Sequence, residues 1–101
     1  MRMSRRSGLL RKAAPKGYEV AYVAMDSYAW PDSPCDQGTI GTYLVGDSVT
    51  VPASMQCYHP DYGRGYFEFV SVYKYATREV YATSMTFTMP AFAVYVLYEY
   101  A

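Results

Sequence analysis

The chain has 101 residues, which is enough for one compact domain and too short for two. Hydrophobic residues make up 51% of it, which excludes a wholly disordered chain, and its 13 tyrosines exceed what one small core can bury. The formal net charge is zero, but the charges are unevenly distributed along the chain. Residues 1–17 carry six cations and no acid, whereas residues 18–101 carry three cations and nine acids. We therefore expect a basic N-terminal arm over residues 1–17 and a domain over residues 18–101.

The first half of the domain predicts short strands separated by turns. Residues 18–25 alternate with period two and are apolar on most of both faces, which predicts a strand. Residues 30–38 are dense in turn formers and predict a long loop. Residues 39–45 and 48–51 are expected to form two short strands joined by a turn at Gly46-Asp47.

The second half continues in the same way. Residues 59–65 contain proline and glycine and predict a loop, and residues 76–82 fit either a turn or a hairpin. Residues 85–88 predict a short strand, and the apolar residues 92–100 predict a strand in the centre of its sheet. Residues 66–75 predict a strand with one face made of Phe67, Phe69, Ser71 and Tyr73 and the other of Tyr66, Glu68, Val70, Val72 and Lys74.

These patterns predict an all-β domain, mainly antiparallel, with five or six strands and no helix. A β-grasp-like arrangement or a small sandwich or barrel satisfies them, with the arm extended in front. The core is expected to bring Phe87 together with Val94 and Val96 of the last strand, because each lies on the apolar face of its strand.

Three pieces of the C-terminal half resemble bacterial surface repeats of the divergent InlB B-repeat type. Residues 46–51 are similar to the turn and strand that open such repeats, and residues 65–69 to their middle glycine-aromatic strand. Residues 85–91, running into Val94 and Val96, are similar to their closing signature. The resemblance covers residues 46–101 and implies a β-grasp-like spacer or adhesive module without catalysis.

Catalytic and metal-binding patterns are weak. Cys57 and His59 lie on the same side of an extended chain, but a catalytic pair needs an orienting third group, and a structural zinc site needs four ligands. Cys35 is distant in sequence from Cys57, and without a secretory context free thiols are favoured over a disulfide. We expect no enzyme activity, no metal and no cofactor.

Two sets of residues are candidates for binding. The arm is predicted to dock on nucleic acid or on a protein subunit, the alternative being a solvated tail, through Arg2, Arg5, Arg6, Arg11, Lys12 and Lys16. Aromatic side chains around the loops are predicted to form a protein-interaction surface that comprises Trp30, Tyr58, Tyr62 and Tyr66.

The expected function is that of a structural or binding module in a larger assembly, such as a phage or virus particle. Its expected partners are other protein subunits, with nucleic acid as a second partner of the arm. No apolar stretch of signal-peptide or membrane-span length occurs, so we expect a virion or intracellular location without a membrane span. The alternative is a cell-surface repeat module with an adhesive or spacer role.

Overall fold

The structure is a computed structural model that describes residues 17–26 and 34–101. These residues contain strands and no helix, which confirms the predicted all-β fold, and so no helix there is long and apolar enough to cross a membrane. The strands are β1 (Gly17–Met25), β2 (Asp36–Leu44), β3 (Ser48–Thr50), β4 (Ser54–His59), β5 (Gly63–Lys74), β6 (Val80–Ala82), β7 (Thr86–Thr88) and β8 (Val94–Tyr100). Residues 1–16 of the predicted arm lie outside the described residues.

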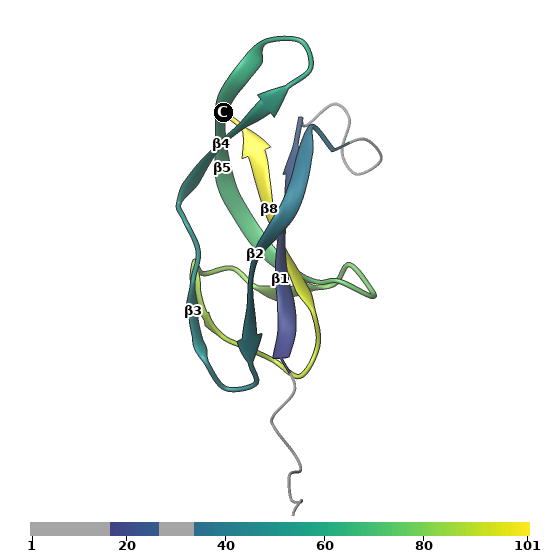
Figure 1. Ribbon diagram of the computed structural model, residues 1–101, viewed down its shortest axis with the longest axis vertical. Coiled ribbons are helices and arrows are strands. Elements are labelled where there is room, and N and C mark those ends of the chain that lie inside the picture. Colours follow the sequence, from purple (N-terminus) through teal and green to yellow (C-terminus); the bar gives the residue numbers. More distant parts are fainter. Residues whose placement is uncertain (1–16, 27–33) are drawn as a thin grey trace, which may run out of the picture.

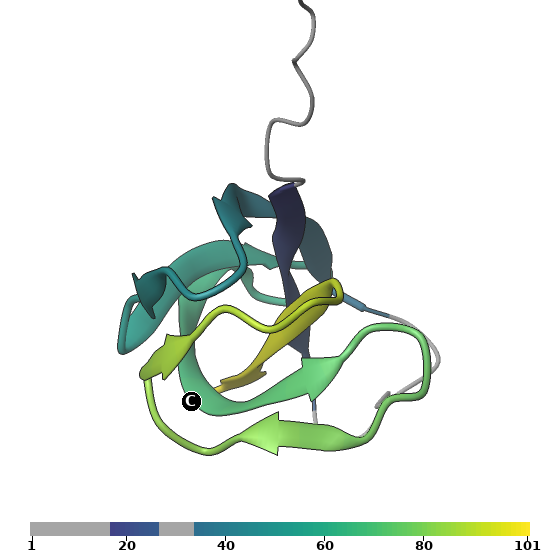
Figure 2. The same ribbon diagram turned by 90° about the horizontal axis from the view of Figure 1, so that it is seen from below.

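Six strands form one curled sheet. Its order is β2-β1-β8-β5-β4, with β6 beside β5, and β3 and β7 form a second, two-stranded sheet. Neighbouring strands are antiparallel except β1 and β8, which run parallel. Figure 2, which looks along the long axis, shows the strands surrounding a common interior. The sheet is thus nearly closed, in line with the barrel-like arrangement among the predicted alternatives, because its edge strands β2 and β4 approach each other without pairing.

The molecule has two distinct ends along the strand direction. The β4–β5 hairpin and the C-terminus lie at one end, and β1 begins at the other (Figure 1). The end of β2 lies beside the start of β1, because Gly17 pairs with Leu44, and the start of β2 lies beside the end of β1, because Ala24 pairs with Asp36.

The position of the last strand follows the prediction. β8 lies between β1 and β5, so both of its edges are paired. Four of its seven residues are buried: Val94, Val96, Leu97 and Tyr98. When both faces of a strand are covered, side chains on both faces must be apolar. This explains why the sequence of β8 is almost continuously apolar.

The buried core fills the space inside the curled sheet. Phe87, Val94 and Val96 belong to one cluster of buried residues, which confirms that they share a core. Phe87 comes from the small sheet, where Val49 lies opposite it and is also buried. The two-stranded sheet is therefore part of the same hydrophobic core as the six-stranded sheet.

The predicted faces of β5 are wrong beyond Phe69. Val72 is fully buried in the same cluster as Phe67, although strict alternation assigns these two residues to opposite faces. The pairing of β5 with β8 shifts register between Phe69 and Ser71, which inserts an extra residue. Such a β-bulge moves every later side chain to the other face.

The predicted loop over residues 59–65 is also shorter than expected. β4 extends to His59 and β5 begins at Gly63, so the connection is a tight hairpin turn between them. Gly63 has a φ of 77°, which a residue without a Cβ adopts at no steric cost. The sequence did not predict β4 as a strand, although β4 forms one half of the β4–β5 hairpin.

Candidate interaction surface

The outer face of the β4–β5 hairpin carries exposed aromatic and basic side chains. The antiparallel register places Tyr58 opposite Arg64 and Gln56 opposite Tyr66. Because residues two apart on a strand point to the same side, these four side chains share one face. Tyr58 is 53% exposed and Tyr66 is 62% exposed. We call Gln56, Tyr58, Arg64 and Tyr66 the hairpin face.

Arg64 is held across this face rather than extended into solvent. Its Nη2 donates a hydrogen bond to the carbonyl oxygen of Gln56, at 3.2 Å. Tyrosine and arginine are enriched in protein interfaces, because they combine a large apolar contact area with hydrogen-bonding groups. The rigid strands beneath them limit the conformational entropy that binding must remove. The hairpin face can therefore contact another macromolecule through its rings and its guanidinium group.

Tyr62 lies elsewhere, at the turn of the hairpin. Its ring is 4.7 Å from the ring of His59 and 5.7 Å from that of Tyr100, measured between centroids. It nevertheless remains 69% exposed, because only one side of the ring is covered. Tyr62 thus closes the end of the barrel over a buried imidazole, and it is separate from the hairpin face.

His59 is buried and both of its ring nitrogens are engaged. Its Nε2 lies 2.7 Å from Oδ2 of Asp26, and the backbone N–H of Asp61 donates to its Nδ1 at 3.0 Å. Since Nδ1 accepts a hydrogen bond, the proton of the neutral ring is on Nε2 and is donated to Asp26. The imidazole therefore ties the end of β1 to the hairpin turn, and neither nitrogen is directed at Cys57.

The two cysteines are free thiols, as the sequence favours. Burial, followed by the charge of Asp36, raises the pKa of the Cys57 thiol. Burial is also the largest cause that raises the pKa of the Cys35 thiol. A protonated thiol is a poor nucleophile. The raised pKa of both thiols therefore fits a packing role better than that of a reactive cysteine. Within residues 17–26 and 34–101, no group of three or more His, Cys, Asp or Glu side chains is arranged to hold a metal ion.

Four acidic residues gather at the end of the barrel that carries the hairpin turn. Asp26 follows β1, Asp36 begins β2, and Asp61 lies in the turn beside His59. Glu99 of β8 lies beside Met25 in the parallel β1–β8 pair. We call Asp26, Asp36, Asp61 and Glu99 the acidic end.

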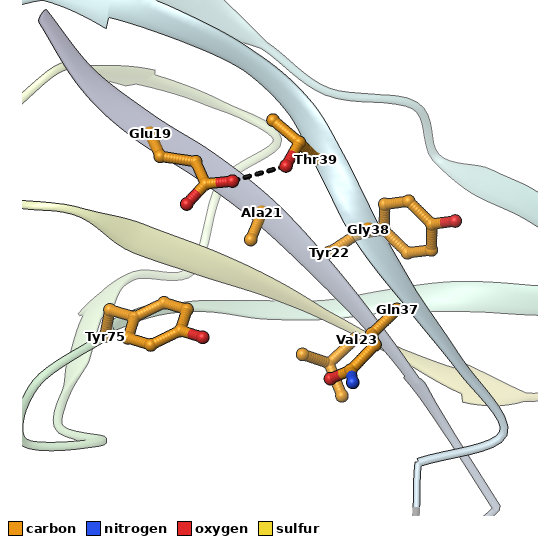
Figure 3. A pocket seen from close by; sticks show the side chains of 8 residues that line it. All are labelled: Glu19, Ala21, Tyr22, Val23, Gln37, Gly38, Thr39 and Tyr75. Atoms are coloured by element: carbon orange, nitrogen blue, oxygen red, sulfur yellow. Dashed lines mark hydrogen bonds between the residues drawn. The ribbon is translucent and has the colours of Figure 1, made fainter.

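A hollow of about 210 Å³ lies on the outer side of β1 and β2, beside Tyr75 (Figure 3). Its polar lining includes the carboxylate of Glu19, which accepts a hydrogen bond from the hydroxyl of Thr39, and the amide of Gln37. The volume is below the range of roughly 300–1,000 Å³ that is typical of pockets for drug-sized ligands. The hollow is therefore smaller than a typical pocket for a drug-sized ligand.

One cross-strand pair on the outer surface is unfavourable and gives a testable prediction. Glu68 of β5 lies directly opposite Glu99 of β8, and both side chains are exposed. Like charges in this arrangement destabilise a sheet, so Glu68→Lys should raise the free energy of unfolding by about 0.2–1 kcal/mol. Thermal melting at low salt measures the gain, and high salt should reduce it by screening. A gain that persists undiminished at high salt would assign the effect to packing instead of charge.

The structure brings some of the predicted binding residues together and not others. Tyr58 and Tyr66 share the hairpin face, whereas Tyr62 packs on His59 instead. Arg64 was not predicted as a binding residue, and its position opposite Tyr58 emerges only once the hairpin register is known. The remaining predicted residues lie outside the described part of the chain: Arg2, Arg5, Arg6, Arg11, Lys12, Lys16 and Trp30.

Comparisons of the chain with protein-family models, with curated proteins and with solved structures found no match. The resemblance of residues 46–101 to InlB B-repeats therefore stays a prediction. The function has to be argued from the surfaces of the molecule itself.

Proposed function

We propose that this protein is a non-enzymatic structural or binding subunit of a larger assembly, with a phage or virus particle as the class of assembly. In this proposal the basic arm anchors the subunit, and the hairpin face contacts a neighbouring protein. The charge of the arm supports the proposal of a particle. A cationic segment next to an acidic body is suited to holding a subunit on nucleic acid or on an acidic neighbouring protein.

The observation that carries the proposal is the hairpin face. Two exposed tyrosines flank an arginine whose guanidinium group is already held in place by a backbone carbonyl. Exposed rings of this size have no role in the core, and their exposure to water is unfavourable in the isolated chain. Contact with a partner removes that apolar surface from water and is the simplest reason to display it.

The charge distribution supports a two-part design. The six cations of residues 1–17 contrast with the body, where nine acids outnumber three cations. A polyanion should therefore attract the arm and repel the body. Binding through the arm alone should weaken with salt, because each phosphate contact releases counterions.

The proposal predicts that the double variant Tyr58→Ala/Tyr66→Ala loses its place in the assembly while the fold is kept. Each replaced side chain is more than half exposed, so each change should alter the free energy of unfolding by less than about 0.5 kcal/mol. Incorporation is measured as the molar ratio of this chain to the other proteins in particles purified from its natural source. Tyr75→Ala is the matched control, because Tyr75 is 55% exposed but lies outside the hairpin face.

Other outcomes separate the two parts of the proposal. Incorporation of the double variant at the wild-type ratio would remove the hairpin face as a contact surface. Deletion of residues 1–16 should also prevent incorporation, and normal incorporation without them would show that the arm is a solvated tail. A wild-type chain that never sediments with a particle would overturn the proposed function as a whole.

A further inference from the structure

The hollow on the outer side of β1 and β2 exists because a small side chain lies among larger ones. Ala21 of β1 is paired with Thr39 of β2 on one side and with Tyr95 of β8 on the other. Side chains paired in this way point to the same side of a sheet, so a methyl group lies between a hydroxyl and an aromatic ring. Figure 3 shows Glu19, Thr39 and Tyr75 around Ala21, which forms the floor of the hollow.

One wall of the hollow is the ring of Tyr75, which two further tyrosines hold in place. The ring of Tyr75 meets that of Tyr95 at a right angle, with 5.8 Å between centroids. Tyr95 in turn stacks on Tyr73 with 5.2 Å between centroids. The backbone N–H of Tyr75 also donates a hydrogen bond to the carbonyl oxygen of Ala93. The ring is nevertheless 55% exposed, so a large part of its aromatic surface is open to a ligand.

The other walls are polar and carry a negative charge. The carboxylate of Glu19 accepts a hydrogen bond from the hydroxyl of Thr39, and the amide of Gln37 lies close by. Within the described part of the chain, no cation forms an ion pair with Glu19. All three side chains are exposed, so these walls are open to solvent. The hollow therefore combines an accessible aromatic ring with an accessible carboxylate whose charge is not neutralised.

We propose that the hollow binds a small organic ammonium ion between the ring of Tyr75 and the carboxylate of Glu19. The face of an aromatic ring attracts an ammonium group, and a carboxylate adds a charge-assisted contact. The body of the protein, with nine acids against three cations in residues 18–101, also attracts cations to its surface. None of the residues that line the hollow belongs to the hairpin face, so this binding is independent of the proposed function.

A neutral sugar is the main alternative ligand, because it too can stack on a tyrosine and bind polar side chains. The charge of Glu19 favours the ammonium ion. A sugar hydroxyl leaves this charge in place, whereas an ammonium ion neutralises it. The same charge disfavours an anion. A cation is therefore the ligand whose chemistry uses both the ring and the carboxylate.

The first experiment titrates the full chain with n-butylammonium chloride at neutral pH and constant ionic strength, followed by the backbone amide signals in NMR spectra. We expect saturable shifts at Glu19, Ala21, Thr39 and Tyr75. 1-Butanol is the neutral control and should bind about tenfold more weakly, because it lacks the charge. Tetramethylammonium defines the class of amine. Equal binding shows that charge and ring suffice, and weaker binding shows that N–H donors contribute.

Two variants test the walls separately. Glu19→Gln removes the charge, keeps the size of the side chain, and should weaken butylammonium binding by about tenfold. Tyr75→Leu removes the ring but stays apolar, and should weaken binding about two- to fivefold, as for an exposed cation–π contact. Both side chains are exposed, so the fold should be kept. Glu68→Gln is the matched control, because Glu68 is exposed and does not line the hollow.

Arg78 provides a test of opposite sign. Burial raises the pKa of Tyr95, and the positive charge of Arg78 acts against this rise, so Arg78 lies near the aromatic wall. Arg78→Asn removes the charge, and asparagine tolerates the positive φ of 63° at this position. The variant should bind butylammonium more tightly than the wild type, and high salt should reduce the difference. An unchanged affinity at low salt would contradict an electrostatic contribution to binding.

Several outcomes would overturn the proposal. The absence of saturable shifts with either ammonium ion is one, and an equal loss of affinity in Glu19→Gln and Glu68→Gln is another. Tighter binding of methyl glucoside than of butylammonium would assign the hollow to a neutral sugar. Butylammonium binding that appears only after deletion of residues 1–16 would show that the chain's own cations occupy the site.

The incorporation test decides the proposed function separately. Tyr75→Ala should bind butylammonium weakly and still be incorporated at the wild-type ratio. Loss of incorporation by Tyr75→Ala would instead make the hollow a contact between subunits and overturn its role as a site for a small ligand. Failure of the hairpin-face variants to affect incorporation leaves the ammonium titration unchanged.

Discussion

Replacing Phe67 with alanine is expected to lower the free energy of unfolding by about 3–5 kcal/mol. Phe67 is completely buried and lies on β5, between Met55 of β4 and Tyr100 of β8. Its ring meets that of Tyr100 edge to face with 5.2 Å between centroids, and it stacks at 6.3 Å on His59. The substitution therefore leaves a cavity where the hairpin, the last strand and the imidazole meet.

Denaturant titration followed by circular dichroism measures this loss. Tyr66→Ala is the control, because Tyr66 precedes Phe67 on β5 but is 62% exposed. Its effect should stay below about 0.5 kcal/mol, as for most surface substitutions. A loss for Phe67→Ala of less than about 1 kcal/mol would show that the ring is not part of a tightly packed core.

The second large effect concerns Tyr98 and alkaline pH. Tyr98 is completely buried, and its hydroxyl donates a hydrogen bond of 2.7 Å to the carbonyl oxygen of Pro52. Burial, followed by the charge of Cys57, raises the pKa of Tyr98 from 10.0 to about 12. The neutral phenol is thus favoured by the fold, and its contribution is fully present below the unfolded-state pKa. This contribution is lost as pH rises from about 10 through about 12, and it amounts to roughly 2–3 kcal/mol.

Tyr98→Phe should therefore change stability in two ways. At neutral pH we expect a loss of about 1–3 kcal/mol, because the Pro52 carbonyl loses its donor. Between pH 10 and 12 the variant should lose less stability than the wild type, because the group that ionises is gone. Tyr58→Phe, at an exposed position, is the control and should follow the wild-type profile. Parallel pH profiles of wild type and Tyr98→Phe would contradict the raised pKa.

Only part of the candidate surface could be predicted from the sequence. The excess of tyrosine required exposed rings, and Tyr58 and Tyr66 are indeed exposed. Their common face with Arg64 depends on the register of β4 with β5, and β4 itself was not predicted. Its residues Ser54–His59 do alternate between exposed and inward positions, but they include no β-branched side chain, so their local preference for a strand is weak. The same register places Tyr62 at the turn, over His59, and so separates it from the other two.

Local patterns in the sequence were enough to predict the all-β class, most strand positions, the central place of β8 and the charge contrast between the basic residues 1–17 and the acidic residues 18–101. Period-two alternation and continuous apolar runs report how a strand meets its immediate surroundings, and they are encoded locally. The folded structure was needed for three further features: the bulge that moves Val72 into the core, the parallel pairing of β1 with β8, and the contact of His59 with Asp26 across 33 positions. These features arise between segments far apart in the chain, where the free energy of the whole sheet outweighs the preference of any one strand.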